Sequence, residues 1–320
     1  MKKIKVLTIC STLLVALLLT GCKNGDSDFP DFEGGTSVYF ANQTPIRTLV
    51  MGEDEYDTTL DNQHKCQIQA TMGGSYNGRD ITLEVAVDES ICNRLFFADG
   101  VTPVQPMPSN YYKLSSTTMH YEGFRGAIEV ELTDDFFNDP KSLSANYVIP
   151  VVIKNQVGAD RILSGTAWDA AENPQRTNLL RWQVVPQDYT LYCVKYICKY
   201  DANYLRHKGG VSGNIEWEKQ EVKNDITTLS LNSIKYPADG CDLKITFGAD
   251  DQVTSIESLT TGKTASGTGY YKANMWSRAW NNKDRDGLHL EYTIDGVKHV
   301  EDLCWQSRGV VKEEFSTIYK

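Results

Sequence analysis

The feature that most constrains the fold of this chain is a series of short segments in which apolar and polar residues alternate. Residues Ile81–Val87 and Ala127–Leu132 alternate in this way, and so does the shorter run Cys66–Ala70. A period of two places successive side chains on opposite faces of a β-strand. Clusters of Gly, Asn, Asp and Pro separate the segments, for example at residues 73–78. The pattern therefore predicts an all-β protein of short strands joined by turns.

Two blocks of these segments flank a stretch that lacks the alternation. Residues 36–165 predict an immunoglobulin-like β-sandwich, and the polar, turn-rich residues 166–187 are interpreted as a linker. In residues 188–320 each short strand follows the last after a brief turn, which is typical of an antiparallel meander barrel of the lipocalin or calycin type. We expect Tyr189–Tyr196 to be the first strand of this barrel. No alternation of strands with helices occurs, so Rossmann and TIM-barrel folds are not expected.

The first 21 residues have the pattern of an export signal. Three lysines within the first five residues precede an apolar run, Val6–Leu19, which is too short to span a bilayer comfortably. The run ends in Leu19-Thr20-Gly21-Cys22, which resembles the lipobox of bacterial lipoproteins. We expect cleavage after Gly21 and lipidation of Cys22, whose acyl chains would anchor the protein to a membrane. The alternative is an ordinary secretory signal followed by a chance cysteine.

Residues 22–35 are polar and are interpreted as a lipidated tether. The whole chain has a formal net charge of −10, and removal of the signal lysines makes the mature chain more acidic. An acidic chain repels phosphate backbones, which argues against nucleic acid as a partner.

Six cysteines follow Cys22, in a compartment where disulfides can form. They are Cys66, Cys92, Cys193, Cys198, Cys241 and Cys304. None forms a C-x-x-C pair, so no zinc site is expected. Cys193 and Cys304 lie opposite the apolar faces of the predicted first and last barrel strands. A disulfide between them across the seam is one hypothesis, and buried free thiols are the alternative.

The motifs that would indicate catalysis are incomplete. The D-x-x-D-x-D-x-E pattern of chitinase-like glycosidases is absent, and its nearest match, Asp284–Leu288, ends in Leu instead of Glu. The segment Val211–Asn214 lacks the second glycine of a G-x-S-x-G nucleophile turn. The five histidines are scattered and form no H-E-x-x-H pair. We therefore predict a non-catalytic protein with no cofactor.

One loop has the spacing of a calcium site. Asn282, Asp284, Asp286 and Gly287 fill positions one, three, five and six of an EF-hand-like loop. Position twelve is Thr293 instead of Glu, and the residues after Gly287 alternate as a strand. A polar β-turn is the preferred interpretation, and no metal site is predicted.

Aromatic residues in polar loops are the candidates for ligand contact. Trp276 and Trp280 lie among Asn and Arg residues, and Tyr204 and Trp217 lie in another polar stretch. Flat aromatic faces pack against sugar rings, while nearby amides and carboxylates bind the hydroxyl groups. These four residues are therefore predicted glycan contacts. The alternative is that each tryptophan plugs the end of the barrel.

Seven stretches resemble a family of Bacteroidetes lipoproteins. Those that resemble its N-terminal domain, which also occurs ahead of chitinase-like endo-glycosidases, are Asn42–Leu49, Gly52–Asp57, Leu132–Phe137 and Asn146–Pro150. Those that resemble the domain commonly found behind it are Tyr192–Ile197, Asn282–Asp286 and Ser307–Val310. Both are domains of unknown function.

The resemblance implies a glycan-handling lipoprotein of a polysaccharide-utilisation system, encoded beside outer-membrane importers. Acidic residues soon after Cys22 also resemble the surface-export signal of such lipoproteins, although Gly and Ser interrupt them. We therefore expect a glycan-binding protein anchored in the outer membrane and facing the cell exterior, with a periplasmic orientation still open. Two alternatives remain, namely a structural or assembly lipoprotein that docks to an importer and a barrel that binds a small apolar ligand.

Overall fold

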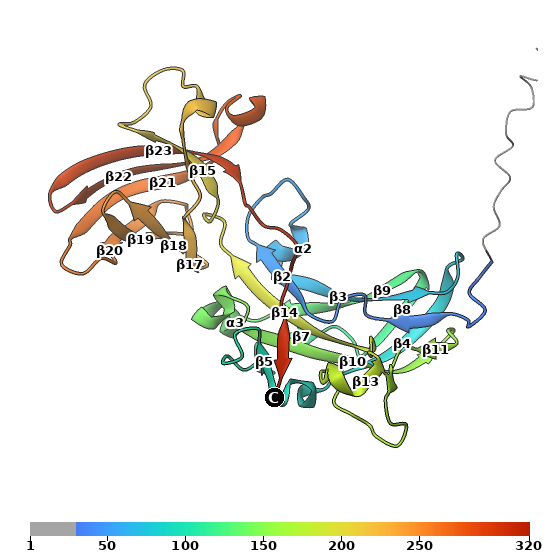
Figure 1. Ribbon diagram of the computed structural model, residues 1–320. Coiled ribbons are helices and arrows are strands. Elements are labelled where there is room, and N and C mark those ends of the chain that lie inside the picture. Colours follow the sequence, from blue (N-terminus) through green and yellow to red (C-terminus); the bar gives the residue numbers. More distant parts are fainter. Residues whose placement is uncertain (1–29) are drawn as a thin grey trace, which may run out of the picture.

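The computed structural model describes residues 30–320, and these form two β-rich domains (Figure 1). The predicted signal segment, Cys22 and the start of the tether lie outside the described residues. Within the described part, no helix is long and apolar enough to cross a membrane. Strands dominate and helices are single turns, so the predicted all-β class is confirmed.

The first domain is a sandwich of two sheets. One sheet has the strand order β11 (Arg161–Ile162), β1 (Ser37–Tyr39), β3 (Lys65–Gly73), β9 (Arg125–Leu132) and β7 (Tyr112–Leu114). The other has the order β24 (Glu313–Glu314), β2 (Pro45–Val50), β14 (Tyr189–Ile197), β10 (Tyr147–Val157), β4 (Arg79–Val87) and β8 (Thr118–Gly123), and β6 (Gln105–Pro106) pairs with β10. Alternation decides which side chains face inward, because Cys66, Ile68 and Ala70 of β3 are buried while Gln67 and Gln69 are exposed.

Short helical turns connect strands in both domains. They are α2 (Thr59–Asn62), η1 (Glu89–Cys92), α3 (Asp134–Asn138), η2 (Pro140–Leu143) and η3 (Leu179–Arg181) in the first domain, and η4 (Trp217–Lys219) and η5 (Trp280–Asn282) in the second.

Strand β14 belongs to the sandwich and not to the barrel, so the prediction that it opens the barrel is wrong. It pairs antiparallel with β10 and parallel with β2. Tyr192 and Val194 face the main sandwich core, whereas Leu191 and Cys193 face a smaller core on the outer side of the same sheet. Burial on both faces explains its nearly continuous apolar sequence, which is typical of a central strand.

Residues 166–187 are a loop within the first domain and not a linker between domains. They leave β11 in one sheet, form the short hairpin β12 (Thr166–Ala167) and β13 (Trp182–Val184), and enter β14 in the other sheet. Arg176 ties the loop back with two hydrogen bonds of 3.0 Å to the buried carboxylate of Asp188.

The end of the chain also returns to the first domain (Figure 1). Strand β24 pairs with β2, and β25 (Thr317–Tyr319) pairs with β5 (Leu95–Phe97). The predicted barrel boundaries, 188 and 320, are therefore wrong at both ends, since both terminal segments contribute to the sandwich.

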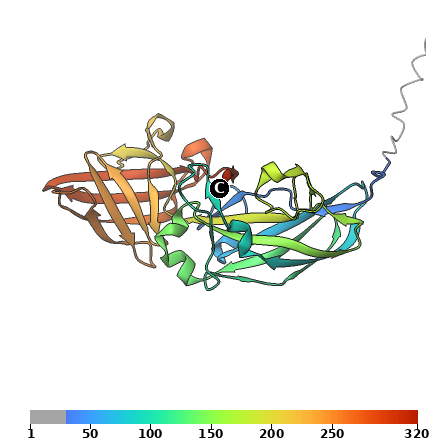
Figure 2. The ribbon, with the colours of Figure 1, turned by 60° about the horizontal axis from the view of Figure 1, so that its bottom comes forward.

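The second domain consists of two curled sheets that pack around one core (Figure 2). One sheet has the order β17 (Thr227–Ser230), β18 (Ser233–Ala238), β19 (Cys241–Phe247) and β20 (Val253–Ser258). The other has the order β16 (Glu221–Lys223), β15 (Asn203–Lys208), β23 (Val297–Ser307), β22 (Arg285–Ile294) and β21 (Ala265–Trp276). The predicted antiparallel meander is present, and an isolated bridge between Gln252 and Tyr270 joins β20 to β21.

Side chains fill the interior of the second domain. Tyr204, Tyr236 and Phe247 are almost completely buried there. Buried Arg206 lies 3.7 Å from the carboxylate of Glu301, which also accepts a hydrogen bond from the Tyr292 hydroxyl at 2.8 Å. A packed interior with a buried ion pair argues against the alternative of a barrel that binds a small apolar ligand.

The six cysteines of the described residues are all buried and free. Cys193 lies in the sandwich on β14, whereas Cys304 lies in the second domain on β23. The hypothesis of a disulfide between them is wrong, because it depended on assigning β14 to the barrel.

Candidate functional site

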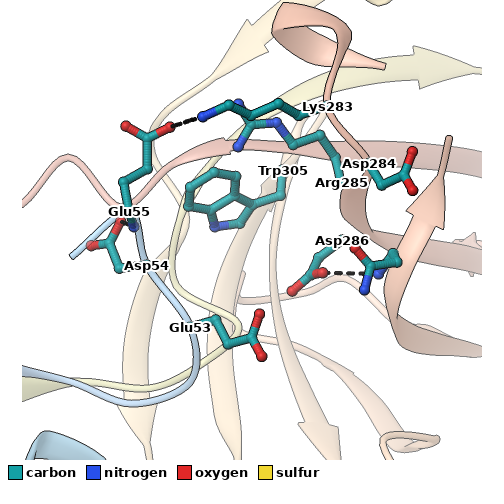
Figure 3. Close-up of a pocket in the computed structure, with 9 residues that line it drawn as sticks. Glu53, Asp54, Glu55, Lys283, Asp284, Arg285, Asp286 and Trp305 are labelled. Carbon is teal, nitrogen blue, oxygen red and sulfur yellow. Dashed lines mark hydrogen bonds and ion pairs between the residues drawn. The ribbon is translucent and has the colours of Figure 1, made fainter. Parts of the chain in front are cut away.

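A pocket of about 200 Å³ lies between the two domains, where the loop after β2 meets the β21–β22 loop and β23 (Figure 3). Its lining consists of Glu53, Asp54, Glu55, Asn274, Lys283, Asp284, Arg285, Asp286 and Trp305. Five of these side chains are carboxylates and two are cations, so the lining is polar with an excess of negative charge.

The acidic loop of the first domain is held in place by its backbone. Buried Arg308 of the second domain donates hydrogen bonds to the carbonyl of Glu53 from its Nε at 3.2 Å and from a terminal nitrogen at 3.0 Å. Gly52 has a φ of +85°, and a Cβ there would lie 2.7 Å from the Cβ of Lys199. Only glycine fits this close approach without strain, so the loop passes tightly against the second domain.

The β21–β22 loop supplies acids that its own hairpin already binds. Asp284 accepts hydrogen bonds from the Arg278 amide at 2.9 Å and the Ser277 hydroxyl at 3.0 Å, which hold the pKa of Asp284 below its ordinary value. Asp286 accepts from the Asn274 amide at 2.9 Å and from the Tyr271 hydroxyl. In the described part of the chain, no three His, Cys, Asp or Glu side chains are arranged to hold a metal ion. Asp284 and Asp286 therefore accept hydrogen bonds from their own hairpin, and Asn282 precedes them at the end of η5.

Two buried donors at the pocket lack hydrogen-bond partners among the described residues. Trp305 is 6% exposed and its Nε1 has no acceptor. Arg285 is also 6% exposed, and one terminal nitrogen makes no hydrogen bond, although it lies 3.8 Å from a Glu55 oxygen. The same guanidinium lies 5.0 Å over the indole ring of Trp305. A buried donor without an acceptor costs about 1–3 kcal/mol, so such atoms mark places where something else can bind.

Two of the four predicted glycan contacts are buried in cores. Tyr204 has no exposed surface, and its hydroxyl donates to the carbonyl of Tyr200 at 3.0 Å. Trp217 is 4% exposed and packs 4.9 Å from the ring of Trp276. The prediction is wrong for these two residues, because the polar residues around them face outward while their own rings complete hydrophobic clusters. Trp280 is half-buried at the edge of the cluster that contains Trp217.

Trp276 does line a surface groove, of about 390 Å³, on the face of β21, β22 and β23 that points away from the core. Tyr270, His289 and Asp302 form a row across the three paired strands, and Lys272 is exposed beside them. The Tyr270 ring lies 5.2 Å from the imidazole of His289.

Hydrogen bonds fix the floor of this groove. Asp302 accepts from the Val211 amide at 2.6 Å and pairs with Nδ1 of His289 at 2.7 Å. The indole Nε1 of Trp276 donates to the Leu303 carbonyl at 2.9 Å. The rings of Tyr270 and Trp276 are therefore held beside an exposed cation.

The interdomain pocket was missed from the sequence, although a signal for it existed. Three of the stretches that resemble the lipoprotein family, Gly52–Asp57, Asn282–Asp286 and Ser307–Val310, meet at or beside the pocket. The three stretches lie far apart in the sequence, so no local pattern indicates that these acidic and basic turns contact one another.

Two family models match the chain. Residues 32–160 match a model described as an N-terminal domain, and residues 199–312 match a domain of unknown function, DUF5627. The second match begins after β14 and so agrees with the domain boundary of the structure. No curated protein matches the chain.

The chain is also similar to three solved structures from Bacteroides ovatus. A structural-genomics protein of unknown function is 34% identical with a TM-score of 0.78, over 91% of this chain and 100% of that chain. A second protein of unknown function is 8% identical with a TM-score of 0.40, over 84% of this chain and 89% of that chain. A third, described as a putative carbohydrate-binding protein, is 13% identical with a TM-score of 0.30, over 86% of this chain and 71% of that chain.

The TM-scores of the last two structures are too low to indicate a shared fold. The similarity to the first structure extends over almost the whole molecule. This chain consists of the matched N-terminal domain followed by DUF5627. It therefore belongs to the family of this Bacteroides ovatus protein.

Proposed function

We propose that this protein is a non-catalytic glycan-binding lipoprotein and that the groove around Trp276 is its glycan-binding surface. The observation that carries the proposal is the pair of rings, Tyr270 and Trp276, held beside exposed Lys272 on an open sheet face. Sugar rings present apolar C–H faces that pack on aromatic rings, and their hydroxyls accept hydrogen bonds from ammonium groups.

The residues that line the groove do not include the pair of carboxyl groups that glycoside hydrolysis requires. That reaction requires two carboxyl groups on either side of the scissile bond. Among the residues that line the groove, Asp302 is the only acid, and its oxygens already accept from His289 and the Val211 amide. Binding without cleavage is therefore the function that this geometry supports best.

The proposed location is the outer membrane, with Cys22 as the lipid-bearing residue and the binding domains facing the cell exterior. The lipobox-like pattern and the polar tether support this part of the proposal. A lipid anchor would keep the groove close to the importer that receives the glycan. Docking to that importer is the second candidate function, and the family resemblance favours it.

Affinity electrophoresis of the mature chain through gels that contain neutral polysaccharides tests the proposal. We expect retardation in at least one gel and about tenfold weaker binding for Tyr270→Ala, equivalent to about 1.4 kcal/mol. Tyr76→Ala is the matched control, because Tyr76 is 66% exposed on the other domain. No retardation in any gel, or equal retardation of Tyr270→Ala and the wild type, would contradict the proposal.

Two further measurements separate the alternatives. Release of reducing ends from a retained polysaccharide would show catalysis and overturn the non-catalytic assignment. Recovery of an importer in a pull-down from membranes, without glycan retardation, would favour the docking function instead.

A further inference from the structure

We propose that the interdomain pocket is a second binding site, and that it takes a compact uncharged polyol of the chemistry of one sugar ring. The proposal extends the proposed function to a separate place on the molecule. Trp305 follows Leu303 on the core face of β23, whereas Asp302 of the groove lies on the opposite face. The two sites are therefore on different sides of the same sheet.

The first argument comes from the unpartnered donors. Trp305 Nε1 is buried without an acceptor, and Figure 3 shows the indole nitrogen on the ring edge that turns toward Glu53 and Asp54. Arg285 contributes a second terminal nitrogen without a hydrogen bond. A ligand that fits must therefore present acceptor oxygens to these two donors.

The second argument comes from the acids around them. The carboxylate of Glu53 has no hydrogen bond or ion pair with another described side chain, and Asp54 and Glu55 lie on the same loop. Ionised carboxylates only accept hydrogen bonds, so the ligand must also present donors. A hydroxyl group both donates and accepts hydrogen bonds. A polyol can therefore accept from the indole and guanidinium donors and donate to the carboxylates of the same pocket.

Charge narrows the ligand class further. Five carboxylates surround only two cations, so the lining repels ligands that carry carboxylate, sulfate or phosphate groups. A simple ammonium ion would suit the acids but has no acceptor for the indole and guanidinium donors. These requirements together favour a neutral polyol over both an acidic sugar and an amine.

The volume limits the size of the ligand. The pocket measures about 200 Å³, below the roughly 300–1,000 Å³ of sites for drug-sized ligands. One sugar ring is a suitable size, whereas an extended oligosaccharide would have to leave the pocket after its first ring. The pocket is therefore suited to the end of a chain or to a free monosaccharide.

Titration by ¹H–¹⁵N NMR of the mature chain tests the inference, with glucose, galactose, mannose and N-acetylglucosamine as the probes. The chain has six tryptophans, and loss of one indole signal in Trp305→Phe assigns that signal to Trp305. We expect at least one neutral sugar to shift the Trp305 indole signal saturably. We also expect glucuronate to bind about tenfold more weakly or not at all, and Glu53→Gln to reduce this difference.

Glu257→Gln is the matched control, since Glu257 is an exposed acid on β20 of the same domain. It should leave both affinities unchanged. The inference would be overturned by the absence of any neutral-sugar shift, by a response to glucosamine or lysine alone, or by equal binding of glucuronate. Tyr270→Ala separates this result from the groove, because it should weaken gel retardation about tenfold and leave the Trp305 response intact.

Discussion

Burial dominates the chemistry of the thiols in this protein. It raises the pKa of Cys66, Cys193 and Cys304 from 9.0 to about 12, and that of Cys198 to about 11. A thiol held protonated in the apolar core is a poor nucleophile and a poor metal ligand. These cysteines therefore behave as small apolar residues that fill space in the two domains.

The raised thiol pKa values predict a loss of stability at alkaline pH. Between pH 9 and about 12 the thiol of Cys193 stays protonated in the folded state but ionises in the unfolded state. The unfolded state then binds fewer protons, so the free energy of unfolding falls as pH rises through this window. Each such thiol contributes up to about 1.4 kcal/mol per pH unit.

Guanidinium unfolding measured at intervals from pH 8 to pH 11 checks this prediction. Cys193→Ala should lose stability less steeply with pH than the wild type, since it lacks one ionising group. Identical pH slopes for the two proteins would contradict it.

At the scale of elements, the C-terminal tail completes the first domain from a distance of more than 200 residues. Strand β24 covers the edge of β2, and Glu313 forms an ion pair of 2.6 Å with Lys195 of β14. Phe315 packs against Phe97, with 5.2 Å between the ring centroids. An unpaired strand edge is a liability, so this tail protects the sandwich as well as adding contacts.

Deletion of residues 313–320 should destabilise the first domain while the second domain remains folded. Loss of the buried part of Phe315 and of two strand pairings should lower the free energy of unfolding by about 2–4 kcal/mol, which corresponds to several degrees in Tm. Calorimetry checks this result. Lys312→Ala is the control, because Lys312 is 80% exposed and its ion pair is with Glu314 across 3.3 Å. An unchanged Tm of the truncated chain would refute the prediction.

At the scale of the whole molecule, Arg308 joins the two domains. Besides the Glu53 carbonyl of the first domain, its guanidinium donates to the carbonyls of Lys199 and Asp201, the latter at 2.9 Å. Arg308 is 5% exposed, so these hydrogen bonds are made by a guanidinium that is shielded from water. The interdomain pocket depends on this contact, because it places the acidic loop opposite Trp305.

Arg308→Met should loosen the domain arrangement without unfolding either domain. Removal of several charge-assisted hydrogen bonds should cost about 3 kcal/mol, and small-angle scattering should show a broader distribution of interdomain distances. Lys283→Met is the control, because Lys283 is 64% exposed and its 3.6 Å ion pair with Glu55 contributes at most about 1 kcal/mol. The prediction fails if both variants give the scattering curve of the wild type.

Local sequence patterns correctly predicted which strand residues face a core, but not the burial of individual aromatic residues in polar stretches. The alternation in Ile81–Val87 correctly placed Ile81, Leu83 and Val85 in a core. Polarity around Tyr204 suggested a surface loop, but the residue occupies an inward position of β15. Trp276, a predicted glycan contact, lines a surface groove, and its contact with a glycan stays a prediction. Trp305 packs in the core of the second domain and also lines the interdomain pocket, which no local pattern indicates.

The sequence by itself determined the all-β class, the short meander strands and the face to which most side chains point, because these depend on periodicity and turn residues within about ten neighbours. Only the tertiary structure decided that β14 and the C-terminal tail join the first domain, and that the Glu53 loop meets Trp305. A strand's pattern specifies its faces and not its hydrogen-bonding partners. Those partners are chosen by packing between segments far apart in the chain, and so is the pocket that forms between them.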